Sequence, residues 1–256
     1  MKTAKQNTAI TNIEKALKIP SIQSLTNKNI VEFDRIYFGH EFCERLLPDL
    51  DQLKRAIDII KKSQAKFSLL TPSVTEYGLK SIKSLVSLLR EDDEVIINDY
   101  GVLNMVETEF KNPILIGRIL SRIVIPTLVS LKGNDISLHH YLSILGQKVQ
   151  GVEVDYFNAS TIDSHLAEIL SISLYKGPLV WTTTKRCAFN TQASTLQKFC
   201  ACKQECLLCQ AVIENVASKK TFLLSGNTIF GQASDAPEIS NNDVFKRIVF
   251  ELKTES

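Results

Sequence analysis

The sequence predicts an α/β protein with a (β/α) barrel-like architecture. Short apolar runs alternate with amphipathic stretches at helical spacing, and about six such units follow one another between residues 34 and 185. The apolar runs end in glycine or polar residues, as parallel strands often do at their carboxyl ends. Six units fit a barrel, complete or incomplete, better than a short open sheet.

The first two units lie in the first third of the chain. A strand at 35–39 (RIYFG) precedes a helix over 50–62, in which apolar residues recur every three or four positions. A strand within 66–73 (KFSLLTPS) then precedes a helix within 75–92, and the Thr75 side chain can cap that helix. Each unit is therefore a strand followed by a helix.

The middle of the chain continues the alternation. A strand, a helix and a strand are expected, in that order, at 94–99 (EVIIND), 102–110 and 113–120 (PILIGRIL). Residues 160–174 predict a further helix, capped by Ser160 or Thr161, between strands at 148–157 and 177–184.

The pattern changes after residue 185. A cysteine-dense segment leads to a hairpin at 222–232 (FLLSGNTIFGQ), a polar loop and a last strand at 246–253 (KRIVFELK). We expect one domain over 1–256, in which βα repeats occupy 34–185 and the cysteine-rich loop, hairpin and final strand occupy 186–256.

Composition narrows the class of protein. With 256 residues, 44% of them hydrophobic, the chain can bury a core without disulfides. The net charge is +2 and charges of both signs are interspersed, so nucleic acid is not an expected partner. The first residues are polar, and no apolar run reaches the roughly 18 residues of a membrane span. A cytoplasmic protein without a membrane span is expected.

Five of the six cysteines lie close together, at positions 187, 200, 202, 206 and 209. In a reducing compartment such a group favours metal ligands over a disulfide framework. Converging thiolates suit a [4Fe–4S] cluster or tetrahedral zinc. A zinc ribbon needs two C-x2-C pairs and this segment has one, Cys206 with Cys209, so the cluster is favoured over zinc. Unligated thiols and a redox disulfide remain open.

The sixth cysteine, Cys43, follows the strand at 35–39 and would stand at the C-terminal mouth of the barrel. A loop after a late strand could reach it there, so Cys43 is a candidate remote ligand. His40 is interpreted as a hydrogen-bonded structural residue. His139 and His140 are expected in a polar turn near Asn134 and Asp135, at the surface.

Several motifs, in this order, resemble one family: IYFGHEFC, VIINDYGVLNMV, PILIGRIL, KRC and a C-x3-C pair formed by Cys202 and Cys206. The family is that of collagenase-like proteins classed as U32 peptidases, of unknown catalytic type. Within it, the chain resembles the UbiU/UbiV branch, and UbiV in particular. The resemblance covers about residues 34–120 and 176–230.

The resemblance implies a barrel-like fold and a four-cysteine [4Fe–4S] cluster. It also implies a part in oxygen-independent hydroxylation during ubiquinone biosynthesis, with a related cluster-bearing protein as partner in a heterodimer. The ligands that it implies by position are Cys43, Cys187, Cys202 and Cys206. Cys200 and Cys209 are additional, and either could replace one of the four.

The resemblance also matches Asn98 and Asp99, at the end of a predicted strand. With Arg118 they would line the rim of the barrel and could orient a small-molecule substrate. Capping a helix or forming a turn suits the chemistry of Asn98 and Asp99 equally well.

Peptidase activity finds no support in the residues, because the sequence has neither a GxSxG elbow nor an HExxH motif. Three classes of function remain open. The chain could be an iron–sulfur-dependent, oxygen-independent hydroxylase component, an accessory protein with an electron-transfer or structural cluster, or a zinc-stabilised binding module.

Overall fold

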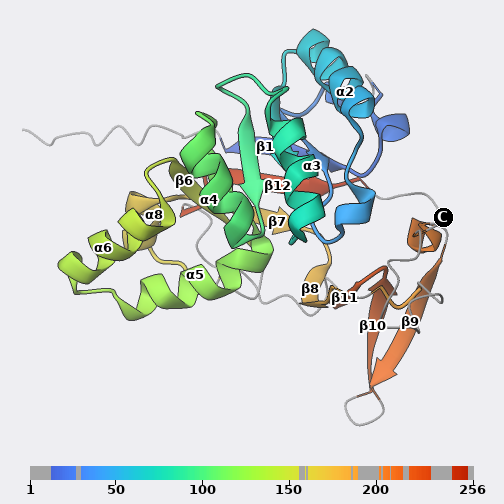
Figure 1. Cartoon of the computed structure of the whole chain (residues 1–256). Helices are drawn as coiled ribbons and strands as arrows, with labels where there is room; N and C mark the ends of the chain where they lie inside the picture. Colours follow the sequence, from blue (N-terminus) through green and yellow to red (C-terminus); the bar gives the residue numbers. More distant parts are fainter. Residues whose placement is uncertain are drawn as a thin grey trace, which may run out of the picture.

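A computed structural model describes residues 13–26, 30–155, 159, 161–185, 187–189, 202, 204–207, 209–215, 219–231 and 244–252. Eight parallel strands close into a barrel in the order β1-β12-β7-β6-β5-β4-β3-β2 (Figure 1). Their bounds are β1 Glu14–Ile19, β2 Arg35–Gly39, β3 Lys66–Leu70, β4 Glu94–Ile97, β5 Ile114–Ile116, β6 Val149–Val154, β7 Ser171–Lys176 and β12 Arg247–Glu251. The predicted fold class is confirmed, and the barrel is complete.

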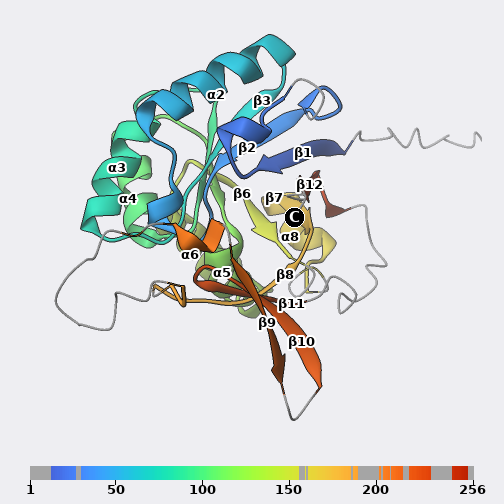
Figure 2. The same cartoon turned by 90° about the vertical axis from the view of Figure 1, so that its right-hand side faces the viewer.

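Helices cover the outside of the barrel (Figure 2). They are α2 Leu50–Ser63, α3 Glu76–Val86, α4 Tyr100–Glu109, α5 Arg118–Ser130, α6 Asp135–Leu145 and α8 Ser164–Ile169, with short 3-10 helices η1 Ile22–Ser24, η2 Glu44–Leu46 and η4 Glu205–Leu207. Their apolar faces and the outer faces of the strands form the larger hydrophobic core. None of the described helices is long and apolar enough to cross a bilayer.

The start of each early helix follows from its sequence. Asp49 and Gln52 form a capping box at α2, in which each side chain accepts the other residue's backbone N–H. Thr75 caps α3 by accepting from Gly78 N, as predicted. In α2 the apolar residues Leu53, Ile57 and Ile60 are buried as expected. Leu50 lies exposed in the first turn.

The interior of the barrel has an apolar middle and charged ends. The smaller core consists of inward-facing residues of seven strands: Ala16, Tyr37, Leu70, Ile96, Leu115, Tyr175 and Val249. At the N-terminal ends of the strands Arg35 and Arg247 pair with Glu14 and Glu94. These four charged side chains are tolerated inside the barrel because each has an ionic partner.

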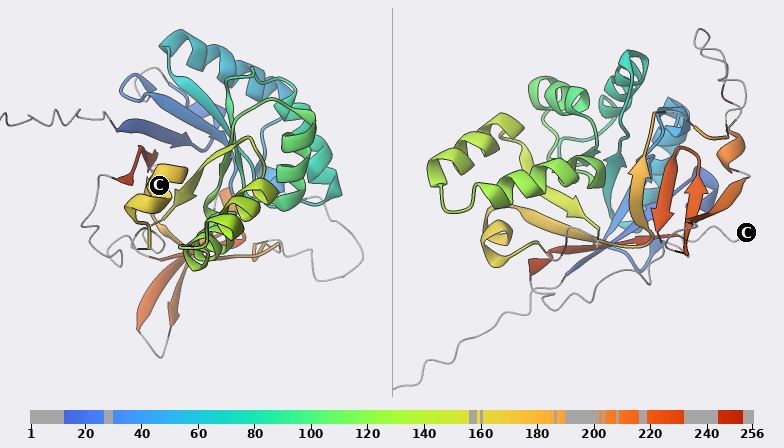
Figure 3. Two further views of the ribbon diagram at one scale, coloured as in Figure 1. Left: turned by 90° about the vertical axis from the view of Figure 1, so that its left-hand side faces the viewer. Right: turned by 90° about the horizontal axis from the view of Figure 1, so that it is seen from below.

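A second, antiparallel sheet is inserted between β7 and β12 and projects from the barrel (Figure 3). Its strands, in the order β8-β11-β10-β9, are β8 Leu179–Thr183, β9 Gln210–Asn215, β10 Lys220–Ser225 and β11 Thr228–Gly231. The predicted hairpin is confirmed as β10 and β11, with Gly226 (φ +61°) in its two-residue turn. The predicted last strand is confirmed as β12.

Four expectations about the elements are wrong. The strand within 113–120 ends at Ile116, because Gly117 is already the N-cap of α5. Residues 171–174 form β7 and not helix, since their side chains alternate in the barrel wall. The run 177–184 joins the second sheet and not the barrel. Asp163, whose side chain accepts from Leu166 N, caps α8 in place of Thr161; Ser160 lies outside the described residues.

Candidate metal centre

The loop that carries Cys43 is fixed directly above the end of β2. Gly39 (φ +129°) ends the strand, and a Cβ there would collide with the Leu70 carbonyl. His40 Nδ1 then accepts from the backbone N–H of Phe42 (3.1 Å) and of Cys43 (3.0 Å). Burial lowers the pKa of His40 to about 3, so the ring is neutral and can accept. The structural interpretation of His40 is confirmed. His139 and His140 are at the surface as predicted, but they lie in helix α6 and not in a turn, because the Asn134 side chain caps a helix there.

The later cysteines lie beside the turn of the β10–β11 hairpin. Ala188 N, next to Cys187, donates to Gly226 O (3.3 Å). Cys206, in η4, is buried against the same turn, where a Cβ on Gly226 would lie 3.6 Å from the Cys206 sulfur. Gln204 N donates to the Cys202 sulfur (3.4 Å). Cys200 lies outside the described residues.

The predicted ligands come together in the structure. The pKa of Cys206 is raised to about 11, first by burial and then by Cys187, Cys43 and Cys202. Burial, Cys202 and Cys187 likewise raise the pKa of Cys43. Cys206 therefore lies near the other three cysteines, and Cys43 lies near Cys187 and Cys202. Cys209 is exposed and is not among the leading causes of either shift, and all five described cysteines are free thiols.

A zinc ion and an iron–sulfur cluster differ in the distance that they require between their four sulfur ligands. Within the described residues, no three His, Cys, Asp or Glu side chains form a group that could hold a single metal ion. Around one zinc ion, with bonds of about 2.3 Å, four sulfurs would stand roughly 3.8 Å apart. A cubane cluster has iron at four corners, so its ligand sulfurs are spread more widely. The two candidate groups therefore require different spacings of the four sulfurs.

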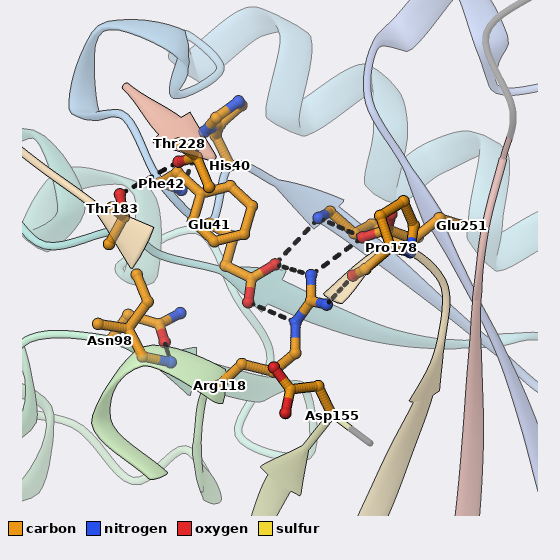
Figure 4. A network of polar contacts seen from close by, with 12 residues as sticks. His40, Glu41, Phe42, Asn98, Arg118, Asp155, Pro178, Thr183, Thr228 and Glu251 are labelled. Atoms are coloured by element: carbon orange, nitrogen blue, oxygen red, sulfur yellow. Dashed lines mark hydrogen bonds and ion pairs between the residues drawn. The ribbon is translucent and has the colours of Figure 1, made fainter. Parts of the chain in front are cut away.

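A buried ionic network fills the mouth of the barrel beside Phe42 (Figure 4). Glu41 accepts from Arg118 Nε (2.8 Å) and Nη2 (2.6 Å), and from Lys18 Nζ (3.0 Å). Glu251 accepts from the same two residues, at 3.0 and 2.8 Å. Burial opposes ionisation of Glu41, but Arg118 and Lys18 together lower its pKa to about 2. Two cations and two anions therefore remain charged and balanced here.

Asn98 is placed at the rim as predicted, but it is engaged within the protein. Its amide donates to Thr71 O (3.0 Å) and accepts from Ile119 N (2.9 Å), near the start of α5. Gly117, the N-cap of that helix, has no side chain to satisfy the helix N–H groups, and Asn98 occupies the space where its Cβ would be.

Asp99 is the N-cap of α4. One carboxylate oxygen accepts from Gly101 N (2.8 Å) and Val102 N (3.3 Å). The other accepts from Ser73 Oγ (3.1 Å) and Val74 N (3.2 Å). Asp99 therefore has the capping role that the sequence allowed.

Apart from Arg118 itself, the residues of this network were not predicted from the sequence. Glu41 lies within the IYFGHEFC motif, so its charge beside a strand end was a usable signal. Lys18 and Glu251 belong to the first and last strands of the barrel, which only its closure brings together.

Two hollows, of about 690 and 380 Å³, lie at the opposite, N-terminal end, and Glu14 and Lys66 line both.

The barrel and its second sheet resemble a known structure. The solved structure described as the U32 peptidase Mk0906 is similar over 99% of this chain and 98% of that chain, with a TM-score of 0.52 and 11% identity. At this identity the likeness shows the fold: an α/β barrel of the kind found in a U32 peptidase. Neither a family model nor a curated protein matches the sequence.

Proposed function

We propose that Cys43, Cys187, Cys202 and Cys206 hold a [4Fe–4S] cluster. The observation that carries this proposal is the convergence of one thiol from the barrel with three from the inserted segment. Burial and the neighbouring cysteines disfavour the thiolate forms of Cys43 and Cys206, and a thiophilic cationic centre would favour them. When bound, such a cluster supplies one-electron transfer.

The chain's own residues suit that role. His40 holds the backbone of Cys43, and the Gly226 turn leaves room for the Cys206 sulfur. The Phe42 ring packs edge-on against Phe230 of the second sheet (5.4 Å between centroids), which covers the barrel side of the site with apolar surface. Such apolar cover on one side would affect the reduction potential of a cluster, because solvent access and hydrogen bonds to sulfur set that potential.

The reaction proposed is oxygen-independent hydroxylation of the kind associated with ubiquinone biosynthesis. It rests on the order of motifs that resembles UbiV, and the U32-like fold is compatible with it. The chain would act as one subunit beside a related, cluster-bearing partner, in the cytoplasm.

One observation favours an electron-transfer or accessory subunit over a chain that is catalytic alone. Arg118 is 1% exposed and fully engaged by Glu41 and Glu251, so it is not free to bind substrate. Asn98 and Asp99 are likewise engaged in helix starts. We therefore place the substrate pocket in the partner subunit, with binding by Asn98, Asp99 or Arg118 as the alternative.

Purification without air tests the cofactor. The expected protein is brown, with about four irons and four sulfides per chain. Colourless protein with one zinc per chain would contradict the proposal and favour the zinc-stabilised module. Co-expression with related neighbouring genes tests the partner, because a chain that stays monomeric would count against a heterodimer.

Deletion of the gene tests the reaction. Hydroxylated quinone precursors are compared between deletion strain and parent, grown with and without oxygen. Loss of a hydroxylated product only in the absence of oxygen is expected. An unchanged profile in both conditions would reject a role in hydroxylation and leave a structural cluster.

A further inference from the structure

One asparagine joins two loops that carry cysteines and that are distant in sequence. Asn227 Nδ2 donates to Phe42 O (2.7 Å) and to Thr184 O (2.6 Å). Phe42 directly precedes Cys43, and Thr184 lies three residues before Cys187. A single side chain thus spans from the end of β2 in the barrel to the end of β8 in the second sheet.

The chemistry of this bridge requires an amide. A primary amide nitrogen has two N–H donors on one atom, and here both are used by backbone carbonyls. Aspartate is almost the same size but would place a carboxylate oxygen against two carbonyl oxygens. Two hydrogen bonds would become two repulsive contacts.

The backbone around Asn227 is fixed independently of its amide. Thr184 N donates to Asn227 O (2.9 Å), and Ala188 N donates to Gly226 O (3.3 Å). Cys206 also packs on Gly226. These contacts tie Cys187 to the turn through main-chain hydrogen bonds and Cys206 through side-chain packing on Gly226. The Asn227 amide adds the bond to Phe42, and so links the turn to Cys43.

We infer that Asn227 is a positioning residue that holds Cys43 at its working distance from Cys187. Its importance for function rests on the proposed cluster, but the geometry that it controls exists without any metal. Loss of the Asn227 amide should move Cys43 away from Cys187 and Cys206. Cys187 and Cys206 should stay close to each other.

Thiol bridging in the metal-free full-length chain tests this inference directly. One background keeps Cys43 and Cys187 and a second keeps Cys187 and Cys206, with the remaining cysteines changed to serine. Dibromobimane reports each pair, because it becomes fluorescent when it bridges two close thiols. Asn227→Asp and Asn227→Ala are compared with Asn104→Asp, at an exposed position of α4.

Both Asn227 variants should bridge the Cys43–Cys187 pair at least fivefold more slowly, and Asn104→Asp should not. The Cys187–Cys206 pair should bridge at the parent rate in all of them. Unchanged bridging of Cys43 in both Asn227 variants would overturn the inference. Equal slowing of both pairs would also overturn it, because the effect would then be on the whole fold.

Iron content separates this inference from the proposed cluster. In the chain with all its cysteines, Asn227→Asp should hold at least twofold less iron than Asn104→Asp after anaerobic purification. Full iron loading of Asn227→Asp would overturn the positioning role while the cluster stands. If bridging changes as expected but the parent chain binds no iron, the proposed cluster fails and the positioning role stands.

Discussion

The guanidinium carbon of Arg118 lies 3.7 Å from the centroid of the Tyr175 ring. The same guanidinium donates two hydrogen bonds to Glu41, so a cation sits between an aromatic face and a carboxylate. All three side chains are buried. Because a buried charge without its partner is costly, this arrangement makes the mouth of the barrel sensitive to the loss of one member.

Arg118→Met should lower the free energy of unfolding by about 3 to 5 kcal/mol, because it leaves Glu41 with only Lys18 and removes the contact with Tyr175. Urea denaturation at neutral pH measures this change. The matched control is Lys111→Met, whose exposed pair with Glu91 should contribute less than about 1 kcal/mol. Equal effects of the two substitutions would contradict the prediction.

Glu153 should make stability fall as pH rises. The pKa of this carboxyl is raised to about 8, first by burial and then by Glu41, while Tyr37 and two arginines oppose the shift. Its stabilising contribution is complete below the unfolded pKa, near 4.5, and is lost as pH rises to about 8.

Glu153→Gln should remove that dependence. Relative to the glutamine variant, the parent chain should lose about 2 to 3 kcal/mol of unfolding free energy between pH 5 and pH 7. Denaturation curves of both proteins at several pH values measure the difference. A constant difference across this range would show that Glu153 is not held protonated.

Cys43→Ala should abolish iron binding, although this cysteine lies far from the others in sequence, because the barrel brings it to the late cysteines. Cys209→Ala should keep about four irons per chain, since Cys209 is exposed and is not one of the four proposed ligands. Iron assays on anaerobically purified variants compare the two. Full iron in Cys43→Ala would move the fourth ligand to Cys200 or Cys209.

Gly117→Ala should destabilise the protein by about 2 kcal/mol, because its Cβ would lie 2.5 Å from the Asn98 amide. Asn98 would have to move away from Ile119 N and leave the start of α5 uncapped. Gly231→Ala is the control, since its Cβ would meet nothing closer than 3.7 Å. Thermal unfolding of both variants measures the effect, and similar melting temperatures would argue against the Asn98 cap.

Local signals in the sequence predicted most of the barrel. Periodicity and caps located β2, α2, β3 and α3, because in those segments apolar side chains face one core and polar ones face water. The strand β1 escaped notice because its inward-facing Glu14 and Lys18 interrupt the apolar pattern. Their partners come from β12 and other distant strands, which no local window contains.

The cysteines of the candidate site could be predicted from the sequence, but the contacts around them could not. Clustering of thiols marked the late cysteines, and the strand before Cys43 placed it at the barrel mouth. The engagement of Arg118 by Glu251 was not predictable, because the two residues meet only through closure of the barrel. The role of Asn227 depends on two backbone carbonyls from separate elements. Every residue has such a carbonyl, so the sequence does not show which two will accept from Asn227.

The position of β12 between β1 and β7 has a consequence for biosynthesis. A ribosome delivers β1 to β7 first, as an open sheet with two unpaired edges, and the second sheet emerges before the strand that joins those edges. Every cysteine assigned here has then left the ribosome while the barrel is still unsealed. The barrel is thus sealed only at the end of synthesis, and a chain that stalls before β12 would expose both adhesive strand edges and reactive thiols.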